Sequence, residues 1–245
     1  AGMQVQAQSA RAVAAQKMVL ELLQSDMPAE AVRADSELDA WARKMNVGAP
    51  RFPRREQPAA DASHPAIAVR LDACIQCTRC LRACREVQVN DVIGYAKRGE
   101  IVFDFNDPMG ASSCVGCGEC VAACPTGALL PKEAAAAEKS VDSLCPYCGV
   151  GCQVTYRVRG DAIVGVDGRD GPANHGRLCV KGRYGYDYPH HPQRLTRPLI
   201  RKPGSAKSVD NTLADFRAAS WEEALDFAAD GLKRIRTRDG RQALA

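Results

Sequence analysis

The sequence predicts an α+β fold built from several small units. Three observations indicate this. Short apolar stretches of strand length alternate with longer stretches of helical periodicity along the 245 residues. Aromatic residues make up only 5% of the chain, which argues against one large core. The 12 cysteines fall into groups, each of which predicts a small metal-binding unit.

The first unit, residues 1–65, is predicted to be a helical segment followed by a linker. Apolar residues recur at helical spacing over 9–24, where Ser9 can serve as the N-cap, and a second helix is predicted over 28–45. Four prolines interrupt residues 46–65, so we expect a surface linker there.

The second unit is predicted over residues 66–135 and the third, rich in β-structure, over 140–200. We expect strands at 68–71 and 101–105, a helical link at 134–137, and a hairpin of 154–158 with 162–166 around the turn Gly160-Asp161.

The last stretch, residues 201–245, is predicted to begin a further domain. Ser220 has capping-box spacing with Glu223 and predicts a helix that runs to about Ile235. Its apolar positions, among them Leu225, Phe227 and Leu232, are expected to face inward.

The spacing C-x-x-C-x-x-C-x-x-x-C occurs twice, at Cys74–Cys84 and at Cys114–Cys124. This repeated spacing is the signature of bacterial ferredoxins with two clusters. In that signature three cysteines wrap one [4Fe–4S] cluster and the fourth binds the other cluster. The repeat therefore predicts one cluster on Cys74, Cys77, Cys80 and Cys124, and a second on Cys114, Cys117, Cys120 and Cys84.

Structural zinc is the alternative for this repeat. Zinc sites usually pair two C-x-x-C motifs across a longer spacer and need no third cysteine in the loop, so the repeat favours clusters. Gly116 and Gly118 are expected to let the second loop adopt positive φ angles.

The third group uses the remaining cysteines, Cys145, Cys148, Cys152 and Cys179. Four sulfurs suit one more [4Fe–4S] cluster, but the spacing alone also allows a zinc ion held by four cysteines. A third cluster beside the first two would extend a line of redox centres.

Other candidate residues are few. Lys181 follows Cys179 by two residues and is either a cation next to a redox cofactor or an ordinary solvated lysine. The four histidines, including His64, His175 and the pair His190-His191, are not needed as ligands because four cysteines complete each site. No nucleophile–base set and no glycine-rich nucleotide loop is evident, so no catalytic residue is predicted.

Charge and hydropathy limit the partners. The formal net charge is +4, but twelve thiolates holding three clusters would bring it to about −2, which removes the argument for nucleic-acid binding. No apolar run approaches the roughly 20 residues of a membrane-spanning helix. The first residues lack the layout of a signal peptide, so we expect a cytoplasmic protein without a membrane partner.

The order of these motifs resembles the catalytic (alpha) subunit of NAD-dependent formate dehydrogenases, which belong to the molybdenum- or tungsten-bis-pyranopterin oxidoreductases. After the ferredoxin repeat come Cys-Pro-Tyr-Cys-Gly-Val-Gly-Cys at 145–152 and Cys-Val-Lys-Gly-Arg at 179–183. The resemblance implies that the third group holds a [4Fe–4S] cluster and that 201–245 begins a pterin-binding α/β domain. It also implies that Lys181 relays electrons between this cluster and the pterin.

The resemblance further implies oxidation of formate to CO2 at a Mo- or W-bis-pyranopterin guanine dinucleotide. Electrons would pass through three [4Fe–4S] clusters to a diaphorase-type partner subunit that carries FMN and NAD. The family's metal-ligating and catalytic residues lie downstream of Ala245, so we expect an N-terminal portion that contains none of them. The family's [2Fe–2S] cysteines are absent from this sequence. The His-plus-three-Cys motif of the complex I large subunit is absent as well, which favours the formate dehydrogenase branch that lacks that cluster.

Three other functions remain open at this point. The chain could be a stand-alone ferredoxin-like carrier with several clusters, or a complex I-type or hydrogenase-linked subunit of the same superfamily. A zinc-only interaction scaffold is the third.

Overall fold

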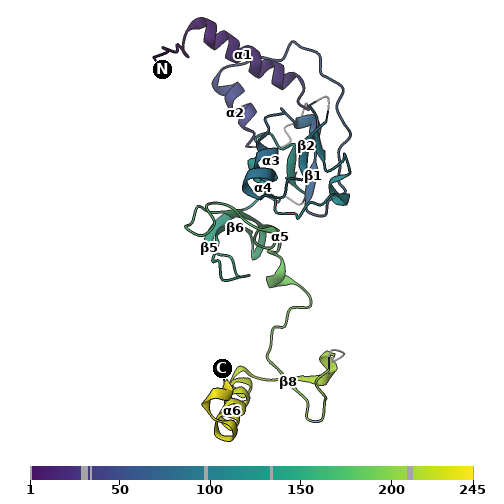
Figure 1. The fold of residues 1–245 in the computed structure, drawn as a ribbon, viewed down its shortest axis with the longest axis vertical. Helices are drawn as coiled ribbons and strands as arrows, with labels where there is room; N and C mark the ends of the chain where they lie inside the picture. The colour runs from purple at the N-terminus through teal and green to yellow at the C-terminus, as the bar shows by residue number, and fades with distance from the viewer. Residues whose placement is uncertain are drawn as a thin grey trace. The chain divides into compact units, whose positions relative to one another are not determined.

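The computed structural model describes residues 2–28, 33, 35–96, 99–132, 135–208 and 212–244 (Figure 1). The chain divides into two compact units, Ala1–Asp187 and Tyr188–Ala245. Both combine helices with small antiparallel sheets, in agreement with the predicted α+β class. None of the helices in the described ranges is both long and apolar enough to cross a bilayer.

Helix α1 (Ala10–Ser25) confirms the first predicted helix, and the Ser9 side chain accepts a hydrogen bond from the Ala12 backbone at 3.3 Å. Helix α2 (Glu37–Lys44) is shorter than the predicted span of 28–45. The Ser36 hydroxyl caps it by accepting from the Asp39 backbone, so the helix starts there. Part of the predicted span, residues 29–32 and 34, lies outside the described residues.

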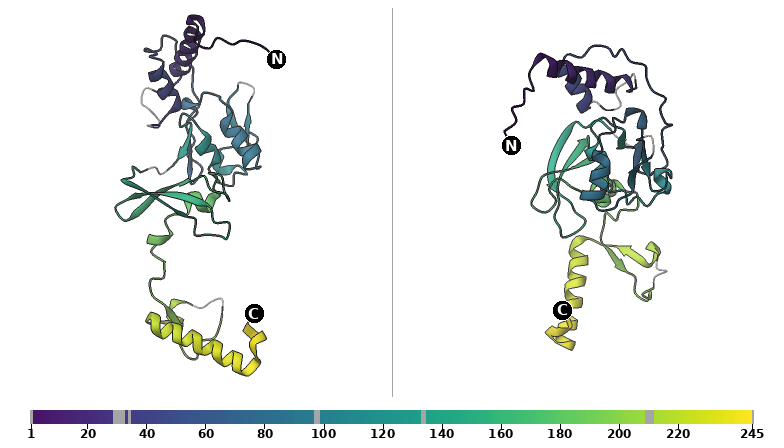
Figure 2. Two further views of the ribbon diagram at one scale, coloured as in Figure 1. Left: turned by 90° about the vertical axis from the view of Figure 1, so that its left-hand side faces the viewer. Right: turned by 45° about the horizontal axis from the view of Figure 1, so that its top comes forward.

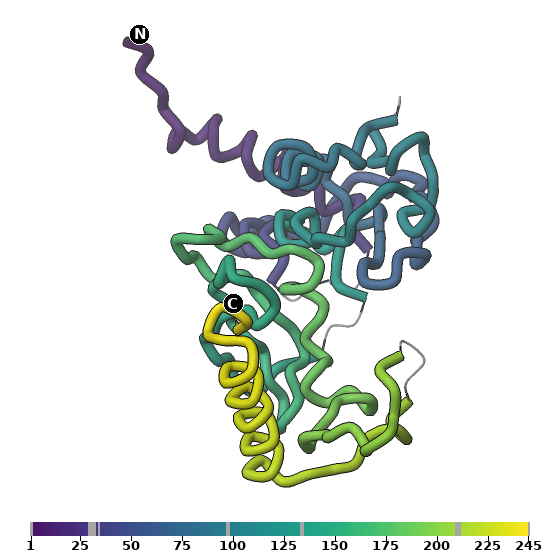
Figure 3. The backbone as a smooth tube through the Cα atoms, turned by 60° about the horizontal axis from the view of Figure 1, so that its bottom comes forward, coloured from purple at the N-terminus to yellow at the C-terminus, as the bar shows by residue number. Residues whose placement is uncertain are grey.

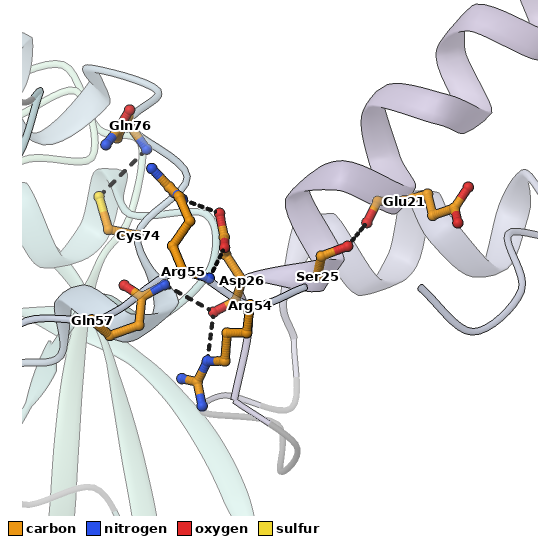
Figure 4. A network of polar contacts seen from close by, with 8 residues as sticks. All are labelled: Glu21, Ser25, Asp26, Arg54, Arg55, Gln57, Cys74 and Gln76. Carbon is orange, nitrogen blue, oxygen red and sulfur yellow. Dashed lines mark hydrogen bonds and ion pairs between the residues drawn. The ribbon is translucent and has the colours of Figure 1, made fainter. Parts of the chain in front are cut away.

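The connector at 46–65 contains no helix or strand, as predicted, but it is fastened to α1 by side chains. Arg51 Nε lies 2.6 Å from a carboxylate oxygen of Glu21, and Arg55 Nε lies 2.6 Å from Asp26. Figure 4 shows Asp26 at the centre of this network, with Arg54 Nε donating to its backbone carbonyl. Ion pairs therefore hold the connector beside helix α1 and its C-cap.

The ferredoxin-like part is built on two pairs of three-residue strands. Strand β1 (Ile67–Val69) pairs with β4 (Leu129–Pro131), and β2 (Ile93–Tyr95) pairs with β3 (Ile101–Phe103). The predicted strands at 68–71 and 101–105 correspond to β1 and β3, whereas the partners were not predicted. Its short helices are α3 (Arg79–Arg82), a π-helical turn (Ala83–Val87) and α4 (Glu119–Ala123).

One core joins these strands and helices. Ile67, Met109 and Leu129 are almost completely buried, and Cys80, Cys84, Cys120 and Cys124 belong to the same apolar cluster. The cysteines of the repeat are thus part of the core of this region.

A three-stranded antiparallel sheet follows, in the order β5 (Lys139–Leu144), β6 (Gln153–Arg159), β7 (Ala162–Gly168) (Figure 2). The β6–β7 pair confirms the predicted hairpin, and Gly160 has a φ of +56° in its turn. The helical link predicted at 134–137 is wrong, because Ala135 to Ala137 adopt no regular structure. The next residue, Glu138, already bonds to Val158, so sheet pairing overrides alanine's helix propensity. Residue 134 lies outside the described residues.

The second unit contains the pair β8 (Leu199–Arg201) and β9 (Phe216–Ala218), followed by α6 (Trp221–Asp239), the long yellow helix in Figure 3. The Ser220 hydroxyl accepts from the Glu223 backbone at 3.0 Å, as the capping-box spacing predicted. The expected inward face is wrong for this unit, because Leu225, Phe227 and Leu232 are all more than half exposed. Helix α6 packs mainly on the turn that follows it.

Candidate metal centres

The first cysteine group lines a small apolar cavity. Cys74 and Cys77 come from the loop leading into α3, Cys80 lies within α3, and Cys124 reaches the same cavity from the end of α4. The Gln76 backbone N–H donates to Cys74 Sγ at 3.4 Å (Figure 4). The structure thus brings together the four cysteines predicted to share one cluster: Cys74, Cys77, Cys80 and Cys124.

The second group lines another small apolar cavity, which is lined also by Ile93, Phe103 and Met109. Backbone N–H groups of Val92 and Gly116 each donate to a thiol sulfur at 3.4 Å. The four cysteines at this cavity are Cys84, Cys114, Cys117 and Cys120.

The two groups are interleaved along the chain. Cys84 lies in the π-helical turn after α3 and lines the cavity of the second loop, whereas Cys124 follows α4 and lines that of the first. A π-helical turn displaces a side chain relative to an ordinary helix, and such turns often occur at functional sites. Each repeat therefore supplies three sulfurs to one cavity and one to the other.

The two loops share one backbone conformation despite different residues. Gly116 and Gly118 have φ angles of +64° and +76°, as predicted, and the equivalent Gln76 and Thr78 have +55° and +65°. Left-handed conformation is costly for residues with a side chain, above all for β-branched ones. The first loop accepts this strain at both positions, which indicates that the shape around the sulfurs is required.

Burial strongly affects the thiols of both groups. Burial, together with the smaller effects of the nearby Cys74, Cys124 and Cys77, raises the pKa of Cys80 to about 12. Burial also raises the pKa of Cys120 well above its usual value, with a smaller effect from Cys117. Buried thiolates need positive charge nearby, and an iron–sulfur core would supply it. The donor set and its surroundings therefore fit a cluster.

None of the twelve cysteines forms a disulfide. Within the described part of the chain, no three His, Cys, Asp or Glu side chains are arranged to hold one metal ion. In a four-iron cluster each of the four thiolates binds a different iron, so four sulfurs spaced around a cavity suit such a cluster.

The third group lies at the end of the three-stranded sheet. Cys145 follows β5, Cys152 precedes β6, and the Cys145 N–H donates to the Cys152 carbonyl at 2.8 Å. Cys179 is the N-cap of α5 (Val180–Tyr184). Burial raises the pKa of Cys152, and the other three thiols add to this effect, which places the four together. Cys148 and Cys179 are exposed.

Lys181 lies exposed in α5, two residues beyond Cys179, and its relay role stays a prediction. Neither His64 nor His175 lines the cavities of the first two cysteine groups, and His175 is exposed. A position in the predicted surface linker suggested that His64 would be exposed, but it is not. It is buried, and its Nδ1 accepts from the backbone N–H groups of Ala66 and Ile67, both at 3.1 Å.

A buried ion pair, which was not predicted from the sequence, joins the second loop to α5. Arg183 lies 2.6 Å from the Glu119 carboxylate, with both side chains about 90% buried. Arg183 Nε also donates to the Cys117 carbonyl at 2.9 Å, and Glu119 accepts from the Leu178 backbone at 3.1 Å. The position of Arg183 four residues after Cys179, at the end of the Cys-Val-Lys-Gly-Arg motif, was the one available signal.

Gly118 is required by this packing as well as by its φ angle. A Cβ atom at this position would overlap Arg183 Cδ and crowd the Tyr184 hydroxyl. The second loop and the helix that starts at Cys179 therefore lie in close contact.

Two family models match the chain. A 4Fe-4S dicluster domain matches residues 73–128, and a Molybdopterin oxidoreductase Fe4S4 domain matches residues 138–191. These two ranges contain all 12 cysteines.

Curated relatives agree with these matches. The chain is 33% identical over 177 residues to the "NADPH-Fe(3+) oxidoreductase subunit alpha" of Geobacter sulfurreducens (strain DL-1 / KN400), which covers 70% of this chain and 19% of that protein. It is 29% identical over 221 residues to "Putative formate dehydrogenase SH0748" of Staphylococcus haemolyticus (strain JCSC1435), which covers 71% and 21%. The chain thus spans about a fifth of the length of these relatives.

Among solved structures, an NAD+-reducing [NiFe]-hydrogenase in the H2-reduced state is similar, with 25% identity and a TM-score of 0.49, over 54% of this chain and 59% of that one. The family models and the curated relatives confirm the superfamily indicated by the cysteine motifs. The chain is an iron–sulfur electron-transfer portion of a molybdopterin oxidoreductase.

Proposed function

We propose that this chain is the electron relay of a formate dehydrogenase and that each cysteine group holds one [4Fe–4S] cluster. The observation that carries the proposal is that the eight cysteines of the repeat line two apolar cavities in interleaved sets of four, while the other four lie together at the end of the three-stranded sheet. The clusters would supply single-electron transfer, and the chain supplies ligation, spacing and burial.

The third group is assigned to the side of the relay next to the pterin. Its sulfurs Cys148 and Cys179 are exposed, and the cation of Lys181 lies on the helix that begins at Cys179. The Mo- or W-bis-pyranopterin guanine dinucleotide of the complete enzyme would supply the oxidation of formate to CO2. No residue of this chain is assigned to catalysis.

The domain organisation is part of the same proposal. Residues 1–65 form the helical segment and connector, 66–135 the part with two clusters, 140–200 the part with the third, and 201–245 the beginning of a pterin-binding domain. The family matches at 73–128 and 138–191 support the two middle assignments.

The proposed electron acceptor is a diaphorase-type partner subunit with FMN and NAD, in the cytoplasm. Support comes from the Geobacter relative, whose name makes it one subunit of an enzyme that uses NADPH. Nucleic acid and membrane are not among the proposed partners.

Iron and sulfide analysis tests the relay directly. The chain prepared without oxygen is expected to contain about 12 irons and about 12 sulfides, because three clusters contribute four of each. The preparation should be brown. About four irons or fewer, with zinc bound instead, contradicts the proposal.

A second candidate is an NAD(P)H-oxidising enzyme that does not use formate, favoured by the 33% identity to the Geobacter subunit. The two are separated by assaying the complete enzyme, with its partner subunit, for dye reduction with formate or with NADPH. We expect formate to reduce the dye. Reduction by NADPH alone would assign the relay to the second candidate.

A further inference from the structure

We propose that the Tyr184 hydroxyl donates a hydrogen bond to a sulfur of the [4Fe–4S] cluster that the second cysteine group would hold, and thereby raises the reduction potential of that cluster. This inference rests on the proposed function in one respect, namely that the second group holds a [4Fe–4S] cluster.

The Tyr184 hydroxyl is buried and unpaired. Its oxygen is shielded from solvent and has no hydrogen-bond partner among the described residues. The ring packs against the apolar core that contains Cys120. A buried hydroxyl without a partner is costly and rare in folded proteins, so its proton is expected to have an acceptor in the loaded protein.

The surroundings of the hydroxyl point to the second cysteine group. A Cβ built on Gly118 would lie 2.5 Å from the hydroxyl oxygen, so the hydroxyl rests against the loop that carries Cys117 and Cys120. Burial raises the pKa of Tyr184; Arg183 opposes this, and thiols of the second group, Cys120 first among them, raise it further. No thiol sulfur of this group accepts from the hydroxyl in the structure, so the inferred acceptor is a sulfur of the bound cluster.

The ion pair of Arg183 with Glu119 fixes this arrangement. Arg183 precedes Tyr184 in α5 and is bonded both to Glu119 and to the Cys117 carbonyl, so the helix cannot move away from the loop without breaking buried contacts. Gly118 has no side chain to block the approach. Arg183 is accordingly a positioning residue for the Tyr184 hydroxyl.

The expected effect has a definite sign. Reduction adds negative charge to a cluster, and a donor to its sulfur stabilises that charge. Hydrogen bonds to the sulfurs are among the factors that set cluster potentials. Tyr184 should therefore make the second cluster easier to reduce.

Tyr95 provides a matched control beside the first group. Burial raises its pKa, and the nearby Cys80, Cys74 and Cys77 add to this. Its hydroxyl, however, already donates to the Gln76 carbonyl at 3.2 Å. Tyr95→Phe thus removes a hydroxyl near sulfurs without removing a free donor.

The experiment compares Tyr184→Phe with Tyr95→Phe in the full chain carrying its clusters. Midpoint potentials are followed by spin-resonance titration, with the second cluster's signal assigned through Cys114→Ser. We expect Tyr184→Phe to lower the second potential alone, with about a tenfold shift in the ratio of reduced to oxidised cluster, or about 59 mV. Tyr95→Phe should leave the second potential unchanged.

An unchanged second potential in Tyr184→Phe, at full iron content, overturns the inference but not the proposed function. A wild-type chain without the expected iron contradicts the proposed function instead. Should Tyr184→Phe fail to fold, 3-fluorotyrosine can be incorporated into the Tyr95→Phe chain. Its more acidic hydroxyl is a stronger donor and should raise the second potential, and the absence of a rise overturns the inference.

Discussion

The two cysteine loops have one backbone shape but opposite surroundings. In the first loop Gln76 and Arg79 are exposed, whereas the equivalent Gly116 and Glu119 of the second loop are buried. Arg79 pairs with the half-exposed Glu37, and Glu119 pairs with the buried Arg183. The spacing of the cysteines therefore sets the backbone shape of a loop, while the segment packed on the loop determines which residues it can contain.

The glycines of the second loop follow from this difference. Left-handed backbone alone does not demand them, because the first loop has Gln76 and Thr78 with similar φ angles. Contact with α5 does require a glycine, because Gly118 lies directly against Arg183 and Tyr184.

Gly118→Ala should have the largest effect. The new Cβ would force Arg183 away from Glu119, and the loop would also adopt a strained φ. We expect the free energy of unfolding to fall by about 4 kcal/mol, which combines loss of a buried pair with left-handed strain. Denaturant unfolding of the anaerobic chain measures this. A loss below about 1 kcal/mol would show that the contact with α5 is not what excludes a side chain.

Glu119→Gln should have the next largest effect. It leaves the Arg183 charge buried without its counter-ion, for which we expect a loss of about 3 kcal/mol. Glu37→Gln is the matched control at the first loop, where exposed partners predict a loss below about 1 kcal/mol. Equal losses in the two variants would remove the distinction between the loops.

Thr78→Gly tests the backbone strain of the first loop. It relieves the left-handed strain of a β-branched residue but adds chain entropy to the unfolded state, so we expect a net gain of only about 0.5 kcal/mol. Chemical unfolding at full iron content would detect the gain. A loss of more than about 1 kcal/mol would mean that the Thr78 side chain has a contact role after all.

Glu21→Gln should have the smallest effect and leave both loops untouched. The Arg51 hydrogen bond holds the pKa of Glu21 below its ordinary value of 4.5 in the folded chain. The ion pair therefore contributes its full stabilisation of the fold at pH values above 4.5. This stabilisation is lost as the pH falls through the lowered pKa of Glu21. The variant should be less stable than wild type at neutral pH and equal to it in strong acid, as thermal unfolding across pH would show. A change in iron content would contradict the assignment of this pair to the connector.

The sequence predicted the grouping of the cysteines because ligand spacing is a local property. The caps Ser9 and Ser220 and the turn at Gly160 were also predicted, since each depends on a few neighbouring residues. The three-residue strands β2 and β4 are too short to show a period. The helix expected over 28–45 was too long because Ser36 caps it much later.

Contacts between distant residues left no comparable signal. Glu119 and Arg183 are separated by 64 residues, and their pairing depends on how α5 packs. The helical link at 134–137 failed because sheet pairing at Glu138 prevailed over the preference of alanine.

The interleaving of the repeats has a consequence for biogenesis. As the chain leaves the ribosome, the first cavity has only three of its sulfurs until Cys124 has been made, and Cys84 waits for the loop at 114–120. Under the proposed ligation, the second set of four sulfurs is complete only after residue 120 and the first only after residue 124, so neither cluster can form from one repeat alone. Deletion of one repeat would leave the other without its fourth sulfur.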